Sequence, residues 1–155
     1  MCRISWFLAV LFFLTTLAMA YMFIYKGSVE SAADGRTAIR LTSSERDLVL
    51  TEMRTFLASV QGITQGIGEQ NMESVSQAAR KVGAAAQQEV PGSLIGKLPL
   101  EFKKLGFDTH SQFDALALDA EQLGDGEHTL TQLSKLMTNC VACHESFRFT
   151  TEGDK

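Results

Sequence analysis

The sequence predicts an all-α protein, an antiparallel four-helix bundle preceded by an N-terminal hydrophobic helix. From Ile4 to Tyr25, 19 of 22 residues are hydrophobic, and about 20 such residues suffice to cross a bilayer as a helix. Beyond residue 42, apolar residues recur at steps of three and four, the helical period. No segment of this part alternates in the manner of a strand. Two short connections and one long one fit an antiparallel bundle.

Length and composition narrow the class of protein. The chain has 155 residues and a net charge of −4, which suits one domain and gives no basic surface for nucleic acid. Three cysteines are too few for a small domain held by disulfides. Beyond residue 25 the chain has no tryptophan and no tyrosine. We therefore expect a domain that is short of large apolar side chains.

Residues 1–25 form either a signal peptide or a transmembrane anchor. Ala18-Met19-Ala20 has the small-x-small form of a cleavage site. The apolar run nevertheless continues to Tyr25, and aromatic residues lie near both of its ends, as they do at membrane interfaces. Both interpretations put the rest of the chain in the periplasm, with the second tethering it to the inner membrane by residues 4–25.

After a polar linker at residues 26–42, capping patterns and apolar spacing indicate the first two helices. Thr42-Ser43-Ser44-Glu45 is a capping box, and we expect a helix from about residue 45 to 67. Asn71 can cap a second helix, which should end by Val90-Pro91-Gly92 because of the proline.

We expect a long connection at residues 91–108 with one short helical turn. Thr109-His110-Ser111-Gln112 is another capping-box pattern and predicts the start of the third helix. Its inward residues should be Phe113, Leu116, Ala120 and Leu123. Gly124-Asp125-Gly126 breaks the chain before the last helix, whose apolar stripe is Leu130, Leu133, Met137, Cys140, His144 and Phe147. His110 and His128 then lie near helix starts, where we expect them to be solvated.

Cys140-Val141-Ala142-Cys143-His144 is the most specific motif in the chain. On a helix, residues three apart share a face, so both thiols project together. Two such thiols can form thioethers with one haem, and the histidine that follows can bind the iron. An exported chain fits this chemistry. The motif therefore predicts one covalently attached haem c.

Three other interpretations of the cysteine pair remain open. A redox dithiol usually lies beside a βαβ unit, and the sequence shows none. A zinc site needs further ligands, but there is no second CxxC and only His110 and His128 remain. A structural disulfide is the third alternative.

The run from Cys140 to Arg148 has the form CxxCHxxFR, and at the end of a four-helix bundle it resembles the cytochrome c′ family, the class II c-type cytochromes. The segment Arg46–Arg54 resembles the first-helix segment of that family on the distal side of the haem, and Phe113 resembles its third-helix aromatic. The resemblance covers about residues 43–149, within a bundle domain at 43–150. The segment Leu98–Phe102 lacks the family's usual tryptophan, and an N-terminal anchor is atypical.

The resemblance implies further site residues. In the low-spin members of the family, a first-helix methionine is the sixth iron ligand, and Met53 matches it here; the alternative is a core methionine. The iron ligands would then be His144 and Met53. Arg148 follows His144 by four residues and would reach a haem propionate. The alternative for Arg148 is a solvated residue near a helix end.

The function that these features predict is electron transfer, by a carrier and not an enzyme. Acidic charge would guide the domain to basic patches on redox partner proteins, which an anchor would confine to the membrane. The family also includes proteins that bind NO or CO at five-coordinate iron, and in that alternative Met53, Phe56 and Leu57 would line the distal pocket. A peroxidase has no support, since no distal His–Arg pair is visible. A homodimer stays open.

Overall fold

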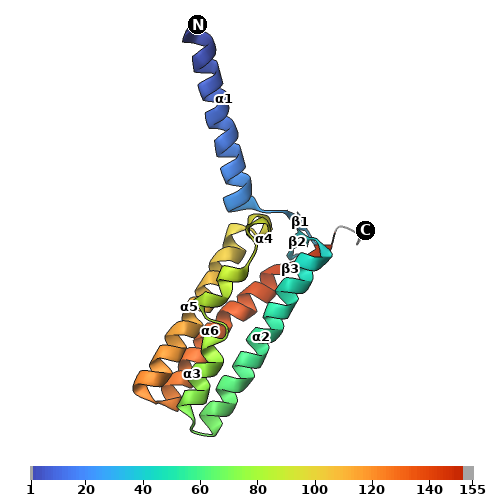
Figure 1. Cartoon of the computed structure of the whole chain (residues 1–155). Helices are drawn as coiled ribbons and strands as arrows, with labels where there is room; N and C mark the ends of the chain where they lie inside the picture. The colour runs from blue at the N-terminus through green and yellow to red at the C-terminus, as the bar shows by residue number, and fades with distance from the viewer. Residues whose placement is uncertain (1, 152–155) are drawn as a thin grey trace.

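The computed structural model describes residues 2–151 and shows a mostly helical chain, with a small sheet. Within these residues there are six α-helices (Figure 1): α1 (Cys2–Ala20), α2 (Ser43–Gly68), α3 (Met72–Arg80), α4 (Gly92–Lys97), α5 (Leu100–Leu123) and α6 (Gly126–Ser146). A π-helical segment, η1 (Tyr21–Lys26), continues α1, and a 3-10 helix, η2 (Ala84–Glu89), follows α3. The prediction of a mostly helical protein with an N-terminal apolar helix is confirmed.

The helices α2, α3, α5 and α6 pack side by side, whereas α1 extends away from them (Figure 1). Each of the four contacts the next in chain order, and α6 also contacts α2. Their apolar stripes meet in a core whose fully buried members include Ile63, Val75, Phe113, Leu116 and Leu136. Spacing in threes and fours thus buries one face of each helix.

Local caps begin two of these helices as predicted. The Thr42 hydroxyl accepts a hydrogen bond from the Glu45 N–H at 3.3 Å, and the Thr42 N–H donates to Glu45 Oε2 at 2.8 Å. Asn71 Oδ1 accepts from the Ser74 N–H at 3.0 Å at the start of α3. Side chains that take up the free N–H groups of the first turn favour a helix at that point.

The helix α3 is shorter than predicted and ends at Arg80. The Asp114 carboxylate of α5 accepts a hydrogen bond from the Ala84 N–H at 2.9 Å. It lies so close to Gly83 that a Cβ there would collide with it. A contact with a distant part of the chain therefore sets the turn after α3.

The start that we predicted for the third helix is wrong. The helix α5 begins at Leu100, directly after Pro99, where a proline is well tolerated. Thr109 lies inside α5, and its hydroxyl donates to the Leu105 carbonyl at 2.7 Å. The connection before α5 does contain one short helix, α4. Phe113, Leu116 and Ala120 are buried as predicted, but Leu123 is 59% exposed.

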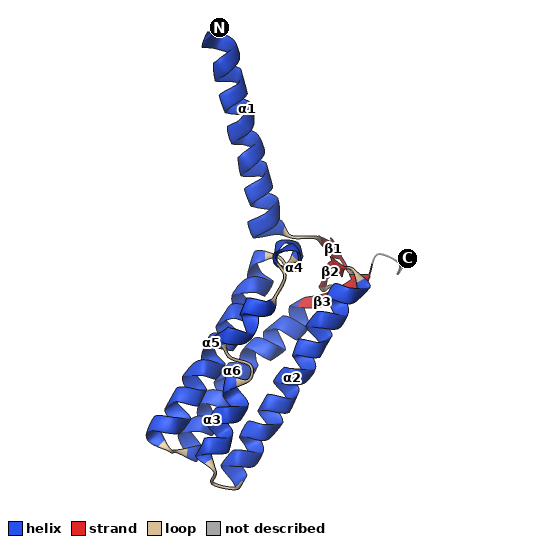
Figure 2. Cartoon of the chain, viewed as in Figure 1, coloured by secondary structure: helices blue, strands red, loops and turns tan. Residues whose placement is uncertain are grey.

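A three-stranded sheet corrects the expectation that the chain has no strands (Figure 2). Its strands are β1 (Val29–Ser31), β2 (Thr37–Leu41) and β3 (Phe147–Thr151), with β2 antiparallel to β1 and parallel to β3. Two of them lie in the segment expected to be a polar linker. Phe147 begins β3 and does not continue the stripe of α6.

The sheet closes a second core at the end of the domain where α1 enters. Ile39 and Leu41 of β2 are fully buried there with Leu94 of α4, and Val49 of α2 packs on them. Alternation fails to reveal β2 because Ala38 and Ile39, neighbours on opposite faces, are both buried. The strand is also short, and its partner β3 lies more than a hundred residues along the chain.

Candidate functional site

An apolar cavity of about 520 Å³ opens between the helices, a size typical of small-molecule and cofactor sites. Its walls come from α2, from η2 with α4, from α5 and from α6. Most of the lining is aliphatic or aromatic, including Val49, Val60, Leu94 and Phe113. Such a lining favours an apolar ligand over a strongly hydrated one.

The predicted motif residues meet in this cavity. Cys140, Cys143 and His144 line it from α6, and Met53 lines it from α2. Met53 also packs against the second core, and its role as an iron ligand stays a prediction. Met53 and Cys140, almost ninety positions apart in the sequence, thus line the same cavity.

Both thiols in the wall are free and half-buried. Burial raises the pKa of Cys140, and burial together with the neighbouring Cys140 raises the pKa of Cys143 to about 11. Both groups are therefore protonated at neutral pH. A redox dithiol has the opposite property, a thiol with a lowered pKa.

Zinc is a second alternative for the cysteine pair. Among residues 2–151, no group of three or more His, Cys, Asp or Glu side chains is arranged to hold a metal ion. Structural zinc takes four such ligands. Zinc binding by the cysteine pair stays an alternative prediction.

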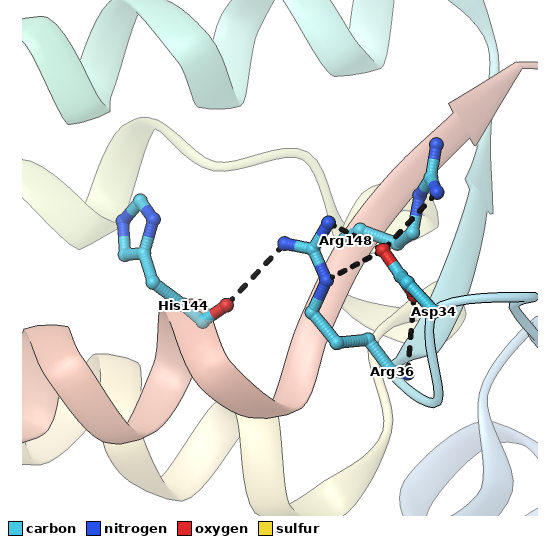
Figure 3. A network of polar contacts seen from close by, with 4 residues as sticks. All are labelled: Asp34, Arg36, His144 and Arg148. Atoms are coloured by element: carbon cyan, nitrogen blue, oxygen red, sulfur yellow. Dashed lines mark hydrogen bonds and ion pairs between the residues drawn. The ribbon is translucent and has the colours of Figure 1, made fainter.

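The backbone of His144 is held from the β1–β2 hairpin (Figure 3). Arg36 Nη1 donates to the His144 carbonyl oxygen at 3.4 Å. The carboxylate of Asp34 orients that guanidinium, with Oδ2 at 3.0 Å from Nε and 2.7 Å from Nη2 of Arg36. His144 lies in the last turn of α6, where carbonyls lack helical partners and a cation is favourable.

Arg148 is not where helical spacing predicts it. The helix α6 ends at Ser146, so Arg148 lies on β3 and not one turn beyond His144 on the same face. Its Nη1 lies 3.3 Å from Asp34 Oδ2 (Figure 3), and it is not among the residues that line the cavity. A role at a haem propionate stays a prediction. The Asp34 pKa is lowered, chiefly by its hydrogen bonds from Arg36.

His110 is buried, which corrects the expectation that it is solvated. Only 5% of it is exposed, and it lines the cavity from the middle of α5. Nδ1 lies 2.7 Å from the Val82 carbonyl oxygen, and Nε2 lies 3.2 Å from Glu52 Oε1. Burial lowers the pKa of His110, but the hydrogen bonds to Glu52 and Val82 outweigh it, and the pKa is raised.

The signal for a buried His110 is present in the sequence once α5 is known to begin at Leu100. His110, Phe113, Ala117 and Ala120 are spaced by three, four and three residues, as one helix face requires. The spacing is missed when Thr109 is taken as the N-cap, because His110 then lies in the first turn and not on the buried face. His128 is exposed near the start of α6 as predicted, with Nε2 3.3 Å from Asp119 Oδ2.

The mouth of the cavity is apolar and open to water. Leu57, Phe107 and Met137 line the cavity, and they are 70%, 47% and 42% exposed. Phe56 and Leu57 also line the cavity, and a distal haem wall formed by them stays a prediction. These three side chains leave apolar surface exposed beside the cavity.

The sequence and the fold show no match to a protein-family model, to a curated protein or to a solved structure. The functional argument therefore depends on the cavity and on the residues that line it.

Proposed function

We propose that this chain is a monohaem c-type cytochrome that transfers electrons and catalyses no reaction of its own. Cys140 and Cys143 would hold haem c through two thioethers, and His144 and Met53 would bind its iron. The observation that carries the proposal is that these four side chains, from α6 and α2, line the same apolar cavity. When bound, the haem supplies a one-electron Fe(III)/Fe(II) couple.

The residues of the chain fit that cofactor. Cys140 and Cys143 lie on one face of α6 and are uncharged at neutral pH. The backbone of His144 is fixed by the hydrogen bond from Arg36 to its carbonyl oxygen. Met53 faces the cavity from α2, and a thioether ligand favours Fe(II) and so raises the potential. Six-coordinate iron needs little rearrangement on electron transfer.

The apolar walls have a separate role. Aliphatic and aromatic side chains of α2 and α5 would exclude water from the haem faces and lower the local dielectric. A buried haem also accounts for a domain without tryptophan or tyrosine beyond residue 25. Its apolar surface fills space that side chains leave open.

The packing of α2, α3, α5 and α6, with the CxxCH motif in the last of them, supports an antiparallel bundle of the cytochrome c′ kind. The sheet β1–β2–β3 is an addition to that pattern. The electron donor and acceptor would be proteins with basic docking patches, because the chain carries a net charge of −4.

We infer that the domain works in the periplasm and remains attached to the inner membrane. Residues Arg3–Lys26 form one helix that is long and apolar enough to cross a membrane, and its most apolar 18-residue stretch is not buried in the domain. A tether would restrict the search for redox partners to the membrane plane.

An optical spectrum tests the proposal. We expect low-spin haem c, with a methionine–iron charge-transfer band in the ferric protein that Met53→Leu abolishes. Met137→Leu is the matched control, because Met137 also lines the cavity but is not the expected ligand. A high-spin spectrum of the wild type would contradict methionine ligation.

That high-spin outcome would favour the alternative, a five-coordinate protein that binds NO or CO. The observation in its favour is the apolar wall formed by Phe56 and Leu57 beside Met53. Failure of the purified chain to retain any haem would contradict both functions.

A further inference from the structure

The end of the N-terminal helix is built into the folded domain. Lys103 of α5 reaches the last turn of η1, where its Nζ donates to the Phe23 carbonyl at 2.8 Å and to the Ile24 carbonyl at 3.1 Å. The same ammonium lies 5.7 Å from the centre of the Phe23 ring. Only 9% of Lys103 is exposed.

A buried ammonium is costly unless it is paired or well hydrogen-bonded. Within residues 2–151, the hydrogen-bond partners of the Lys103 ammonium are backbone carbonyls and not carboxylates, and its burial lowers its pKa. Its partners are carbonyls at a helix C-terminus, which lack helical N–H donors and carry the negative end of the helix dipole. Lys103 of α5 therefore caps the C-terminal end of η1.

Two glycines let the backbones come together at the same place. Gly27, at φ +67°, lies against the end of α4, and a Cβ there would be 2.7 Å from the Pro99 nitrogen. A Cβ on Gly96 would be 2.6 Å from Cδ2 of Phe23. The Ser28 N–H also donates to the Lys97 carbonyl at 2.7 Å. This segment is in close contact with the domain, in contrast to a flexible linker.

The contact depends on the helix that precedes it. In a π-helix each N–H bonds to the carbonyl five residues earlier, so η1 takes its acceptors from the last turn of α1. Cleavage after Ala20 would remove those acceptors and leave the end of η1 with the bond from the Gly27 N–H to the Met22 carbonyl at 2.9 Å. An intact N-terminal helix thus supports the start of η1, and the bond from Gly27 to Met22 closes its end.

The junction lies where the bilayer surface would be. At 1.5 Å per residue, the 24 residues of Arg3–Lys26 span about 36 Å, slightly more than the roughly 30 Å hydrocarbon core. Tyr21 and Tyr25 are 55% and 56% exposed at the domain end, with their rings 5.4 Å apart. Tyrosine is enriched at that depth in membranes.

We propose that Lys103, Gly27 and Gly96 lock the domain to its membrane helix, so that the domain stands in one fixed orientation on the lipid bilayer. Lys103 itself and Leu94 and Ile95 of α4 also line the cavity. The helices α4 and α5, which contact the anchor, therefore also form part of the cavity wall. A fixed orientation would keep the cavity at a constant distance from the bilayer, where a membrane-bound partner would meet it. This proposal rests on the membrane attachment proposed above and not on the identity of the cofactor.

The test uses the full chain in phospholipid bilayers and compares Lys103→Met with Lys104→Met. Lys104 is the adjacent residue on α5, and its side chain is 61% exposed. We expect Lys103→Met to increase trypsin cleavage at the Lys26–Gly27 bond by about tenfold, since cleavage follows the population of the open junction. Polarised infrared spectra of oriented bilayers should show dichroism from the domain helices in the wild type and in Lys104→Met, and lose it in Lys103→Met.

A second pair of variants changes no charge. Gly96→Ala should displace the Phe23 ring and open the same bond to trypsin, whereas Gly92→Ala, at a glycine of α4 with nothing within 4 Å of its added Cβ, should not. Circular dichroism confirms that each variant is folded. Equal cleavage in wild type, Lys103→Met and Gly96→Ala overturns the proposal, and so does a mature chain that begins at Tyr21. Haem content is measured in parallel, so loss of the junction and loss of the cofactor are distinguished.

Discussion

Arg36 Nη1 donates a hydrogen bond to the main-chain oxygen of His144 at 3.4 Å, across 108 positions of sequence. The bond joins the β1–β2 hairpin to the last turn of α6, which carries the candidate haem motif (Figure 3). Asp34 accepts from the same guanidinium and from Arg148 of β3. The hairpin and the strand after the motif therefore hold the end of α6 from two directions.

Arg36→Ala removes the hydrogen bond to the His144 carbonyl and the ion pair with Asp34. Because both side chains of the Arg36–Asp34 pair are more than a third exposed, we expect a modest loss of about 0.5–1 kcal/mol in the free energy of unfolding. Thermal unfolding measures it. Arg40→Ala, an exposed arginine on β2, is the matched control and should leave stability unchanged. An equal loss in both variants would show that the contact with His144 contributes nothing of its own.

The two cysteines should hold the cofactor independently. Acid–acetone extraction should leave the haem on the wild type and on each single variant, Cys140→Ala and Cys143→Ala, because one thioether suffices to retain it. The double variant should release it. The absorption maximum of the reduced pyridine haemochrome should shift stepwise as thioethers replace vinyl groups. Extractable haem in the wild type would disprove covalent attachment.

His110→Gln should destabilise the domain strongly, by about 2–3 kcal/mol, since it disturbs a buried pair of hydrogen bonds to Glu52 and Val82. His128→Gln should cost less than about 0.5 kcal/mol, because His128 is exposed. Chemical denaturation of both variants at neutral pH provides the comparison.

The His110 pair also has a pH dependence with a definite sign. Its pKa is raised above the ordinary value of 6.5, so its protonated form stabilises the folded state. That stabilisation is complete below pH 6.5 and is lost as the pH rises through the higher folded-state value. The stability difference between wild type and His110→Gln should shrink over that range. A difference that grows with pH would contradict a protonated histidine.

Glu45→Gln should weaken the start of α2. Glu45 accepts from the Thr42 N–H at 2.8 Å and from Lys97 Nζ at 2.7 Å, and we expect a loss of about 1 kcal/mol. The pKa of Glu45 is lowered, chiefly by Lys97, so its contribution is present above pH 4.5 and disappears as the pH falls through the folded-state value. Glu101→Gln, in an exposed pair with Lys104, should have almost no effect in the same thermal assay.

The sequence by itself determined the features that depend on neighbours along the chain. The capping box at Thr42, the cap at Asn71 and the break at Gly124 each act within a few residues, and the structure contains all three. The spacing within Cys140–His144 is likewise local to one helix. These features put Met53 and the motif on helices, and the prediction that they share a site follows from the family resemblance.

Only the tertiary structure decided what depends on distant contacts. Asp114 ends α3 early, and pairing between β2 and β3 takes Arg148 off the helix. Contacts of the His110 imidazole with Glu52 and Phe56 of α2 and with the Val82 carbonyl hold it in a buried place. In each case a local preference worth a fraction of a kcal/mol competes with burial or hydrogen bonding between segments far apart, and the long-range term is larger. Propensity therefore predicts that a helix exists better than where it ends.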